Sequence, residues 1–483
     1  MSRTSHTWPT SPRGHLAVAA ALVVLLAACG GDGDGGGGGD DAADVNATAP
    51  AAAGVNPLPI PPLLEATVVD GVARYDLSIR TASHDFGTGV DADTIAYNDE
   101  SVLGPTLRWR TGDDVEIRVT NNLEETTTTH WHGADVPAED DGGPHSRIAP
   151  GETWVADFPV IQPAATLWYH PHLKDITAEQ VYAGAAGMII VDDDNAVTAD
   201  LPHTYGVDDI PVILQDREFD GAGVPVFEID DGDEGDLNPD LTVNGASDVY
   251  TTVPAGPVRL RLLNGSQARV YELSVGNGTM VKIASDGGYL PSSVPIDELT
   301  LAPGDRAEII VDTRAGPTTL IDANFGRVLE LRPNDSLPTA ERPPARLAIL
   351  EQIDPATIDV DRTFDLDEVD GGWGINGQQM DMMRIDETIQ FGDTERWTLT
   401  ASDGVHVFHV HQTQFQILEI DGEPPGPEAA GWEDSVLITE GQEIVIAARF
   451  DTYANPDVPY MFHCHILDHE DTGMMGQFVV VDP

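Results

Sequence analysis

Basic residues are scarce in this sequence. Lysine and arginine together number 24 against 82 aspartates and glutamates, which gives a formal net charge of -58. The only lysines are Lys174 and Lys282. Proteins that bind nucleic acid need a basic face to neutralise phosphates, so this composition excludes that class of partner. The acidic excess is typical of a solvated surface, and attraction of metal cations is a side effect that it allows.

Long hydrophobic runs are missing as well. Residues 16–28 are apolar throughout, but a helix needs about 20 such residues to cross a bilayer, and no later segment is long enough. Arg3 and Arg13 precede this run, and the box Leu-Ala-Ala-Cys-Gly at 26–30 closes it, as in bacterial lipoprotein signals. The sequence therefore predicts a signal peptide at 1–28. An ordinary secretory signal with an incidental cysteine is the alternative.

The cleavage box also predicts where the protein is held. Cys29 would become the lipidated first residue, and residues 29–55, rich in Gly, Asp and Ala, would form a flexible tether. There is no Arg-Arg pair in residues 1–15 to suggest the twin-arginine route. We expect an exported cell-envelope lipoprotein, anchored by lipid at Cys29 to the membrane outside the cytoplasm.

Cysteine is nearly absent from the chain. Besides Cys29, the sequence holds Cys464 alone. With Cys29 acylated, Cys464 has no partner for a disulfide. A single leftover cysteine in an exported chain indicates a thiolate with a working role.

The composition favours strands over helices. The chain has 48 glycines and 35 prolines, and short runs of residues with strand preference recur along it. Three blocks repeat the same order of elements: a turn and strand, a second turn and strand, and a closing apolar strand. These elements lie at 112–119, 149–158 and 188–191, at 256–262, 302–311 and 346–350, and at 392–399, 439–450 and 478–481.

The repeat predicts an all-β protein made of three related β-sandwiches. We place their boundaries at 56–195, 196–352 and 353–483. At 483 residues, the chain has about the length that three such domains need.

One motif near the C-terminal end holds the set of ligands that a mononuclear copper electron-transfer centre needs. Cys464 is flanked by His463 and His465, and His469 and Met474 follow. Thiolate, imidazole and a weak thioether suit such a centre. Neighbours on a strand point to opposite faces, so Cys464 can face one metal while both flanking histidines face another site.

Ten of the fifteen histidines fall into four clusters. Histidines two apart on a strand share a face, whereas His406, three before His409, turns to the opposite face. Strand parity therefore sorts Cys464, His406, His469 and Met474 into one site. The remaining eight form a second site between the first and third blocks, enough for about three metals. They are His130, His132, His170, His172, His409, His411, His463 and His465.

A zinc site or a surface pair is the alternative for any one of these histidine pairs. Four clusters beside a Cys/Met centre favour copper instead. The middle block, with only His203, is predicted to be structural.

With these motifs in view, the sequence resembles the three-domain multicopper oxidases, and among them the bacterial copper-efflux oxidases and their laccase-like relatives. The resemblance covers the chain after residue 55. The matching stretches are HWHG at 130–133, DGGP at 141–144, QPAATLWYHPH at 162–172, INGQQMDMMRID at 375–386, HVFHVHQTQFQIL at 406–418 and HCHILDHEDTGMM at 463–475.

The resemblance implies three consecutive cupredoxin-like, Greek-key β-sandwich domains and four copper ions. A type-1 copper would have His406, Cys464, His469 and axial Met474 as ligands. The other implied ligand sets are His130 and His409 for type-2 copper, His132, His170 and His465 for one type-3 copper, and His172, His411 and His463 for the other. Electrons from a reducing substrate would pass through Cys464 to the cluster, where O2 is reduced to water. We expect a monomer.

Three acidic residues match positions that serve the reaction in the copper-efflux relatives. Asp141 and Glu470 match positions for proton delivery, and Asp403 lies near the expected substrate edge of type-1 copper. The alternative is that each is simply one of the 82 acidic residues.

The sequence departs from the family in two ways. Val407 and Gln412 replace the usual proline and glycine of one motif without removing a ligand. A methionine-rich insert is absent, and Met380, Met382 and Met383 are predicted to pack rather than to collect copper.

The electron donor therefore stays open between phenols, aromatic amines and Cu(I), with a cuprous oxidase dedicated to copper tolerance as one alternative. A nitrite reductase would not need eight cluster histidines. A non-enzymatic copper-binding envelope protein would be expected to have lost ligands.

Overall fold

The computed structural model describes residues 54–195, 200–229, 232, 235, 237–369 and 371–483. The described residues belong to one unit, Ala52–Pro483. The predicted signal peptide, Cys29 and all but the last two residues of the predicted tether lie outside them. Strands dominate the described chain, which confirms the prediction of an all-β fold.

The first sandwich packs two five-stranded sheets against each other. In β7, Val115, Ile117 and Val119 alternate with more exposed residues and point into the core, the period of two expected of a half-buried strand. In order of pairing, one sheet has β3 (Thr67–Val69), β4 (Val72–His84), β7 (Asp114–Asn121) and β9 (Thr153–Pro159), with β5 (Ala92–Tyr97) beside β4. The other has β2 (Leu63–Leu64), β6 (Thr106–Arg110), β11 (Gly187–Asp192), β10 (Ala165–His170) and β8 (His130–His132).

The middle sandwich packs a six-stranded sheet against a seven-stranded one. The first has β1 (Asn56–Pro57), β15 (Val249–Pro254), β23 (Gly326–Asn334), β22 (Thr318–Asp322), β17 (Tyr271–Val275) and β20 (Leu299–Leu301). The second has β13 (Pro225–Val226), β12 (Asp209–Phe219), β16 (Pro257–Asn264), β21 (Arg306–Asp312), β18 (Met280–Ser285) and β19 (Gly288–Ile296), with β14 (Asp240–Val243) on β12. Because β1 pairs with β15, the start of the described chain adds a strand to this sandwich.

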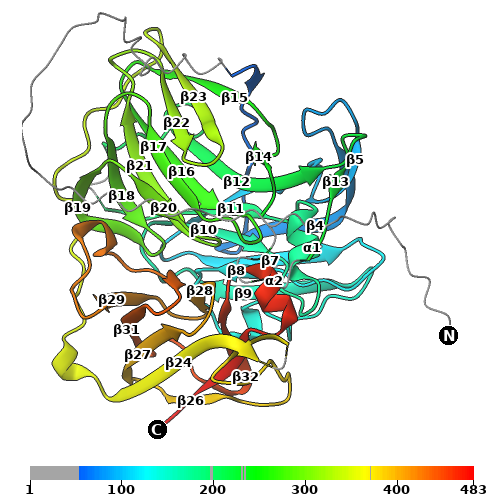
Figure 1. Ribbon diagram of the computed structural model, residues 1–483, viewed down its shortest axis with the longest axis vertical. Coiled ribbons are helices and arrows are strands. Elements are labelled where there is room, and N and C mark those ends of the chain that lie inside the picture. Colours follow the sequence, from blue (N-terminus) through cyan, green and yellow to red (C-terminus); the bar gives the residue numbers. More distant parts are fainter. Residues whose placement is uncertain (1–53, 196–199, 230–231, 233–234, 236, 370) are drawn as a thin grey trace, which may run out of the picture. The chain divides into compact units, whose positions relative to one another are not determined.

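The third sandwich again has two five-stranded sheets. One has β25 (Gly372–Ile375), β24 (Val360–Val369), β27 (Thr394–Ala401), β31 (Glu443–Arg449) and β29 (Phe415–Ile420). The other has β26 (Glu387–Gln390), β33 (Met475–Val481), β32 (Asn455–Cys464), β28 (Val405–Val410) and β30 (Ser435–Thr439). Figure 1 shows its yellow-to-red strands below the green strands of the middle sandwich.

The repeated turn-and-strand elements are confirmed except for one. Their strands are β7, β16 and β27, then β9, β21 and β31, and the closing strands are β11 and β33. The prediction of a strand at 346–350 is wrong, since an isolated bridge from Arg346 to Ser292 is the pairing recorded in that range. Pro343 and Pro344 come just before it and carry no N–H to give to a ladder.

Helical elements are few and short. They are α1 (Thr177–Tyr182), α2 (Leu467–Thr472) and the 3-10 turns η1 (Ala138–Asp140), η2 (Pro355–Thr357) and η3 (Pro427–Ala429). In the described part of the chain, none of them has the length and apolarity to span a bilayer.

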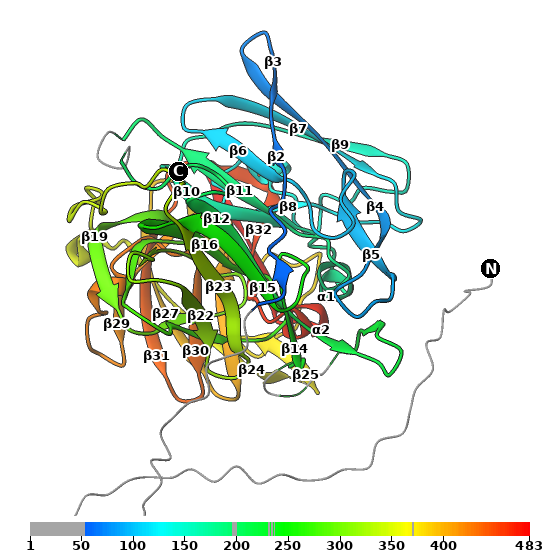
Figure 2. The same cartoon turned by 90° about the horizontal axis from the view of Figure 1, so that it is seen from above.

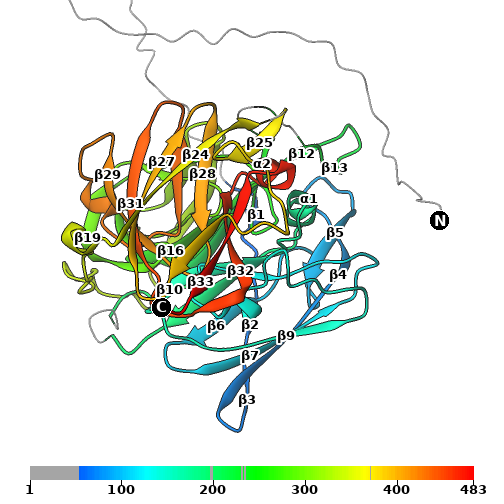
Figure 3. The same ribbon diagram turned by 90° about the horizontal axis from the view of Figure 1, so that it is seen from below.

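The two α-helices lie side by side in all three views and join the first sandwich to the third (Figure 1, Figure 2 and Figure 3). The carboxylate of Asp471 in α2 accepts hydrogen bonds from the backbone N–H groups of Thr177 at 3.0 Å and Ala178 at 2.8 Å. It thereby satisfies N–H groups that a helix start otherwise leaves without partners.

Candidate metal centre

Strand register brings the four histidine clusters together in pairs. In the first sandwich, β8 runs antiparallel to β10 and places His130 opposite His170. In the third sandwich, β28 runs antiparallel to β32 and places His409 opposite His463. The same register sets Cys464 opposite Phe408, one step along the strand. Adjacent residues on each strand therefore serve different faces of its sheet.

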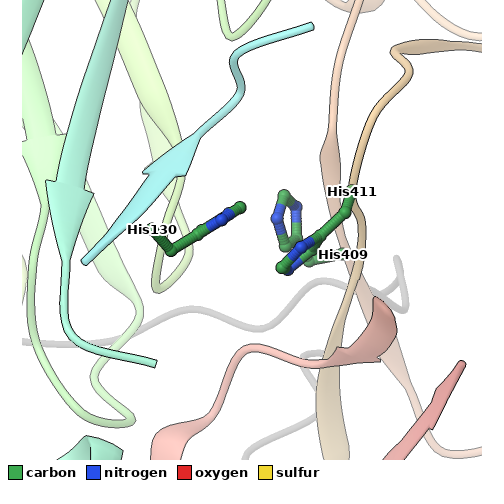
Figure 4. Close-up of side chains that lie close together, drawn as sticks. All are labelled: His130, His409 and His411. Carbon is green, nitrogen blue, oxygen red and sulfur yellow. The ribbon is translucent and has the colours of Figure 1, made fainter. Parts of the chain in front are cut away.

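The predicted ligands converge into groups whose candidate ligand atoms all lie within 4.8 Å of one another. Figure 4 shows His130 pointing from the first sandwich toward His409 and His411 of the third. Four groups consist of predicted ligands alone: His130, His409 and His411; His132, His170 and His465; His172, His411 and His463; and His406, Cys464 and His469. We call the last group, with Met474, the sulfur site and the eight histidines of the others the histidine site.

In the sulfur site, one nitrogen of each ring faces the thiol. Cys464 Sγ lies 3.8 Å from Nδ1 of His406 and 3.7 Å from Nδ1 of His469. The opposite nitrogens, Nε2, donate to backbone carbonyls, His406 to Asp403 at 2.8 Å and His469 to Gly232 at 3.2 Å. These bonds fix the orientation of both rings and leave Nδ1 for a metal.

Burial shapes the protonation of the sulfur site. Burial raises the pKa of the Cys464 thiol to about 12, although the backbone N–H of Val407 donates to Sγ and lowers it. Burial also lowers the pKa of His469 to about 3, so this imidazole is neutral at pH 7. A cation bound between them would stabilise the thiolate, as metal sites do by releasing a proton. Met474 follows His469 by five residues and is fully buried. Its backbone carbonyl accepts a hydrogen bond from the Cys464 N–H.

The histidine site holds ring nitrogens that fit a metal. Several are buried and have no hydrogen-bond partner among the described residues, which costs free energy unless a ligand satisfies them. These atoms are Nε2 of His130, Nδ1 of His132, Nε2 of His170, Nδ1 of His172, Nε2 of His409 and both ring nitrogens of His465.

The histidine site also favours neutral rings, the form that binds metal. Burial, reinforced by neighbouring histidines, lowers the pKa of His132, His170, His172, His409 and His465 well below the ordinary value. Burial lowers the pKa of His411 to about 3. A set of neutral, convergent imidazoles beside a thiolate and thioether suits copper.

Two of the three predicted acidic residues contact the histidine site. Asp141 Oδ2 accepts from Nδ1 of His411 at 2.9 Å, and its backbone carbonyl accepts from Nδ1 of His130 at 2.8 Å. Burial raises the pKa of Asp141, but interactions with His411 and His130 outweigh it and lower the pKa overall. Glu470 is fully buried and lies 3.2 Å from Nδ1 of His172 and 3.3 Å from Nδ1 of His463.

Asp403, the third predicted acidic residue, lies at the sulfur site. Its recorded contact with His406 is made by its backbone carbonyl, as described above. Its side chain is half-buried.

Two residues that contact the ligands went unnoticed in the sequence. The buried ring of Trp373 lies with its centroid 4.3 Å from that of His469 and 5.2 Å from that of His406. Asp434 accepts a hydrogen bond at Oδ1 from Nε2 of His132 at 3.0 Å, and with His132 and His409 it forms a fifth group of possible ligands. No spacing links either residue to the histidine motifs, so the sequence carried no signal for them.

A cavity of about 510 Å³ reaches the histidine site from outside. His130 and His411 lie among its lining residues, together with Asp135, Gln412 and Arg449. Burial raises the pKa of Asp135 to about 7. The cavity is large enough for several small molecules such as water or O2.

The structure corrects one expectation about the methionines. Met383 is 91% exposed, so the prediction that it packs is wrong. It lies in a turn whose backbone N–H is held by the Asp381 carboxylate, which leaves the thioether in solvent. Met380 and Met382 are half-buried.

Comparison with protein families gives two matches that together cover more than half of the chain. Residues 78–196 and residues 342–483 each match a family described as multicopper oxidase. The first match spans the histidines of β8 and β10, and the second spans Cys464 and the histidines of β28 and β32.

Two curated relatives with different names match most of the chain in sequence. A multicopper oxidase mco of Staphylococcus aureus is 36% identical over 422 residues, which is 85% of this chain and 89% of the relative. The cell division protein FtsP of Escherichia coli (strain K12) is 37% identical over 461 residues, 91% of this chain and 96% of the relative.

Solved structures agree in fold. A laccase-like multicopper oxidase CueO from Ochrobactrum sp. superposes with a TM-score of 0.82 at 37% identity, over 88% of this chain and all of that one. A multicopper oxidase from Pediococcus acidilactici superposes with a TM-score of 0.81 at 30% identity, over 89% and 92% of the two chains. These likenesses confirm three consecutive cupredoxin-like β-sandwiches. The chain belongs to the multicopper oxidase family and is a copper-dependent oxidoreductase with O2 as its electron acceptor.

Proposed function

We propose that the chain binds four copper ions, one in the sulfur site and three in the histidine site. The observation that carries this proposal is the convergence of four ligand groups with buried, unpartnered ring nitrogens among the described residues. His406, Cys464 and His469, with Met474 as a weak axial ligand, would hold a type-1 copper. The assigned sets are His130 and His409 for type-2 copper, and for the two type-3 coppers His132, His170 and His465, and His172, His411 and His463.

Bound copper would supply single-electron oxidation of a donor at the sulfur site and four-electron reduction of O2 to water at the histidine site. The chain itself links the two sites. Cys464 belongs to the sulfur site, while its neighbours His463 and His465 belong to two different groups of the histidine site. The peptide backbone of these three residues is therefore the shortest covalent route for electrons between the sites.

We assign the protons that O2 reduction consumes to two carboxylates. Glu470 can pass a proton at Oε1 or Oε2, since these atoms face His172 and His463. Asp141 holds Nδ1 of His411 through Oδ2 and can move a proton there. The cavity beside His130 and His411 gives water and O2 a route to the same place. Asp403 is proposed to lie at the donor edge of the sulfur site, through its contact with His406.

The donor is proposed to be a phenol, an aromatic amine or Cu(I). The similar multicopper oxidase from Ochrobactrum sp. has oxidase activity towards lignin model compounds, which favours aromatic donors. The exposed thioether of Met383 offers a soft ligand for Cu(I). Comparison of O2 uptake with a phenol and with Cu(I), in the wild type and in Met383→Leu, separates these donors. Loss with Cu(I) alone would favour the cuprous role.

The decisive experiment measures copper content, visible absorbance and O2 uptake on the purified, copper-loaded chain. We expect about four coppers per chain, a strong blue band and O2 consumption with at least one donor. Protein that binds copper without colour and consumes no O2 with any donor would refute the proposal.

The N-terminal segment determines where in the cell we expect the protein to be. We propose export, cleavage before Cys29 and lipid anchoring of a monomer whose domains span 56–195, 196–352 and 353–483. Replacement Cys29→Ala should release the protein from the membrane fraction. Retention of the Cys29→Ala protein on membranes would argue against the lipid, and an exported protein that is soluble in both forms would favour an ordinary secretory signal.

A further inference from the structure

The middle sandwich, which supplies no predicted ligand, nevertheless reaches the histidine site. Arg306, the first residue of β21, is 1% exposed. Its Nη1 donates to Oδ1 of Asp434 at 2.7 Å, and its Nη2 donates to Oδ2 of the same carboxylate. Such a bidentate pair is stronger and more specific in geometry than a single hydrogen bond.

Asp434 in turn contacts two histidines through different atoms. Its Oδ1 accepts from Nε2 of His132 at 3.0 Å, while its backbone carbonyl accepts from Nδ1 of His409 at 2.8 Å. The two rings are stacked, with centroids 3.8 Å apart and planes 11° apart. Since the bonded nitrogens differ, the free nitrogens differ too: Nδ1 on His132 and Nε2 on His409.

The middle sandwich also holds the backbone at Asp434. The Asp286 carboxylate accepts from the N–H of Asp434 at 3.2 Å and of Ser435 at 3.3 Å. It accepts from the N–H of Arg306 at 2.7 Å as well. Both the side chain and the backbone of Asp434 are therefore fixed by residues of another sandwich.

Two glycines mark how closely these parts approach. At Gly133, beside His132, an added Cβ would lie 2.5 Å from Nη2 of Arg306 and 2.7 Å from Oδ2 of Asp434. At Gly304, in the turn before β21, an added Cβ would lie 2.9 Å from the ring of His465. Both have positive φ, so side chains are disfavoured there on two grounds.

We propose that Arg306 is a positioning residue for the copper cluster. By holding the Asp434 carboxylate in place, it fixes the rings of His132 and His409 so that His132 presents Nδ1 and His409 presents Nε2 to their metals. This inference rests on the proposed function, because it presumes copper in the histidine site. Engagement of both carboxylate oxygens by Arg306 also makes Asp434 an outer partner of the histidines and not a ligand. Outer hydrogen bonds of this kind orient metal-binding imidazoles and fix their tautomers.

The chain offers a matched control in the same sandwich. Arg259 on β16 is 4% exposed and donates through Nε at 2.8 Å, and through Nη2, to Glu308, which is also buried. No contact between Arg259 and a histidine is recorded among the described residues. Both donors of Arg259 reach the same oxygen, Oε2, whereas Arg306 reaches both oxygens of Asp434. Replacement of either arginine by lysine keeps the charge and removes the planar fork of N–H donors.

The test compares full-length, copper-loaded wild type, Arg306→Lys, Asp434→Asn and Arg259→Lys. Copper per chain, the blue band and the electron paramagnetic resonance of the type-2 copper are measured, with thermal unfolding of each metal-free protein. We expect Arg306→Lys and Asp434→Asn to keep the blue band, to lose cluster copper affinity by about 10- to 100-fold and to change the type-2 signal. Arg259→Lys should keep the wild-type copper content, blue band and type-2 signal, even if it unfolds at a lower temperature.

The outcomes distinguish failure of the proposed copper binding from failure of the positioning role of Arg306. A wild type that lacks cluster copper refutes the proposed function before any variant is compared. Wild-type copper content and an unchanged type-2 signal in Arg306→Lys and Asp434→Asn would overturn the positioning role. Equal copper loss in Arg259→Lys would overturn it as well, because the effect would then follow general stability. If Arg306→Lys does not fold, Asp434→Asn, nearly identical in shape, decides the matter.

Discussion

The sulfur site takes its residues from a short part of the chain, and the histidine site takes them from a much longer part. His406, Cys464 and His469 all come from the third sandwich, within 63 residues of one another. The histidine site takes four residues from the first sandwich and four from the third, and the span from His130 to His465 includes the whole middle sandwich. The ligands of the sulfur site come from one core, with one recorded bond from His469 to Gly232 of the middle domain, whereas the histidine site depends on how separate cores dock. The first should therefore survive changes that empty the second.

The largest expected effect tests whether the two sites are joined through Cys464. The change Cys464→Ser removes the thiolate from the sulfur site and leaves both flanking histidines in place. The blue band should vanish, and donor-driven O2 uptake should fall by more than about 100-fold. A fall of about 100-fold is the upper end of what loss of an outer hydrogen bond costs a metal site, and loss of a ligand should cost more. Cluster copper, counted by metal analysis, should stay. Turnover that survives would mean that electrons reach the histidine site by another route.

A smaller effect is expected at the histidine site from Glu470→Gln. The amide keeps the shape of the side chain but cannot transfer a proton as a carboxylate does. We expect kcat to fall about 100-fold, in the range that general acid–base groups contribute, with copper content and blue band unchanged. Glu443→Gln, an exposed acid on β31, is the control. Equal losses in both variants, or a kcat like that of the wild type in Glu470→Gln, would contradict the role in proton transfer.

The free energy of unfolding of the metal-free protein should depend on pH, and the slope should reflect the number of buried histidines in each site. Folded His411 and His469 have a pKa of about 3, below the ordinary value of about 6.5 in an unfolded chain. The unfolded state therefore binds more protons between these values, and stability is complete above pH 6.5 and is lost as pH falls toward 3. Each such histidine contributes a slope of at most about 1.4 kcal/mol per pH unit.

Chemical denaturation at several pH values measures this slope. His411→Ala should flatten it, and a double change that adds His172→Ala should flatten it further, since burial lowers the pKa of His172 too. His203→Ala, an exposed histidine of the middle sandwich, should not change it. A wild-type stability that stays constant from pH 7 to pH 4 would contradict the prediction.

The smallest effect is expected from Trp373→Phe at the sulfur site. The smaller ring leaves space beside His469 and His406 but removes no ligand. We expect the blue band and the reduction potential of the sulfur site to shift, with copper content and the type-2 signal unchanged. A changed type-2 signal would show that the two sites are coupled more widely than the Cys464 link.

The sequence carried more information about the ligands than about their supports. Histidines and cysteine stand at fixed short spacings on strands, and strand parity alone separates Cys464 from His463 and His409 from His406. Arg306 and Asp434 lie 128 residues apart, and no local period connects them. Contacts of that kind depend on how sandwiches dock, which single-strand patterns do not encode.

The two failed expectations have local causes. Residues 346–350 have the apolar composition of a strand, but the structure leaves Ile349 83% exposed and gives the segment one bridge. The hydrophobic residues indicated a buried strand there. Pro343 and Pro344, just before it, lack the backbone N–H groups that pair strands in a sheet. Met383 was expected to pack because it lies in the motif that begins the third block, yet a turn directs it outward.

The order of the sandwiches along the chain has a consequence for biosynthesis. A growing polypeptide that has emerged as far as His172 already contains the four site histidines of the first sandwich, while their partners at 409–411 and 463–465 do not yet exist. Contacts of such high sequence separation form slowly, because long loops must close first. During that interval the exposed imidazoles could capture zinc or another abundant ion. Copper loading is therefore best regarded as a late maturation step, which follows docking of the third sandwich.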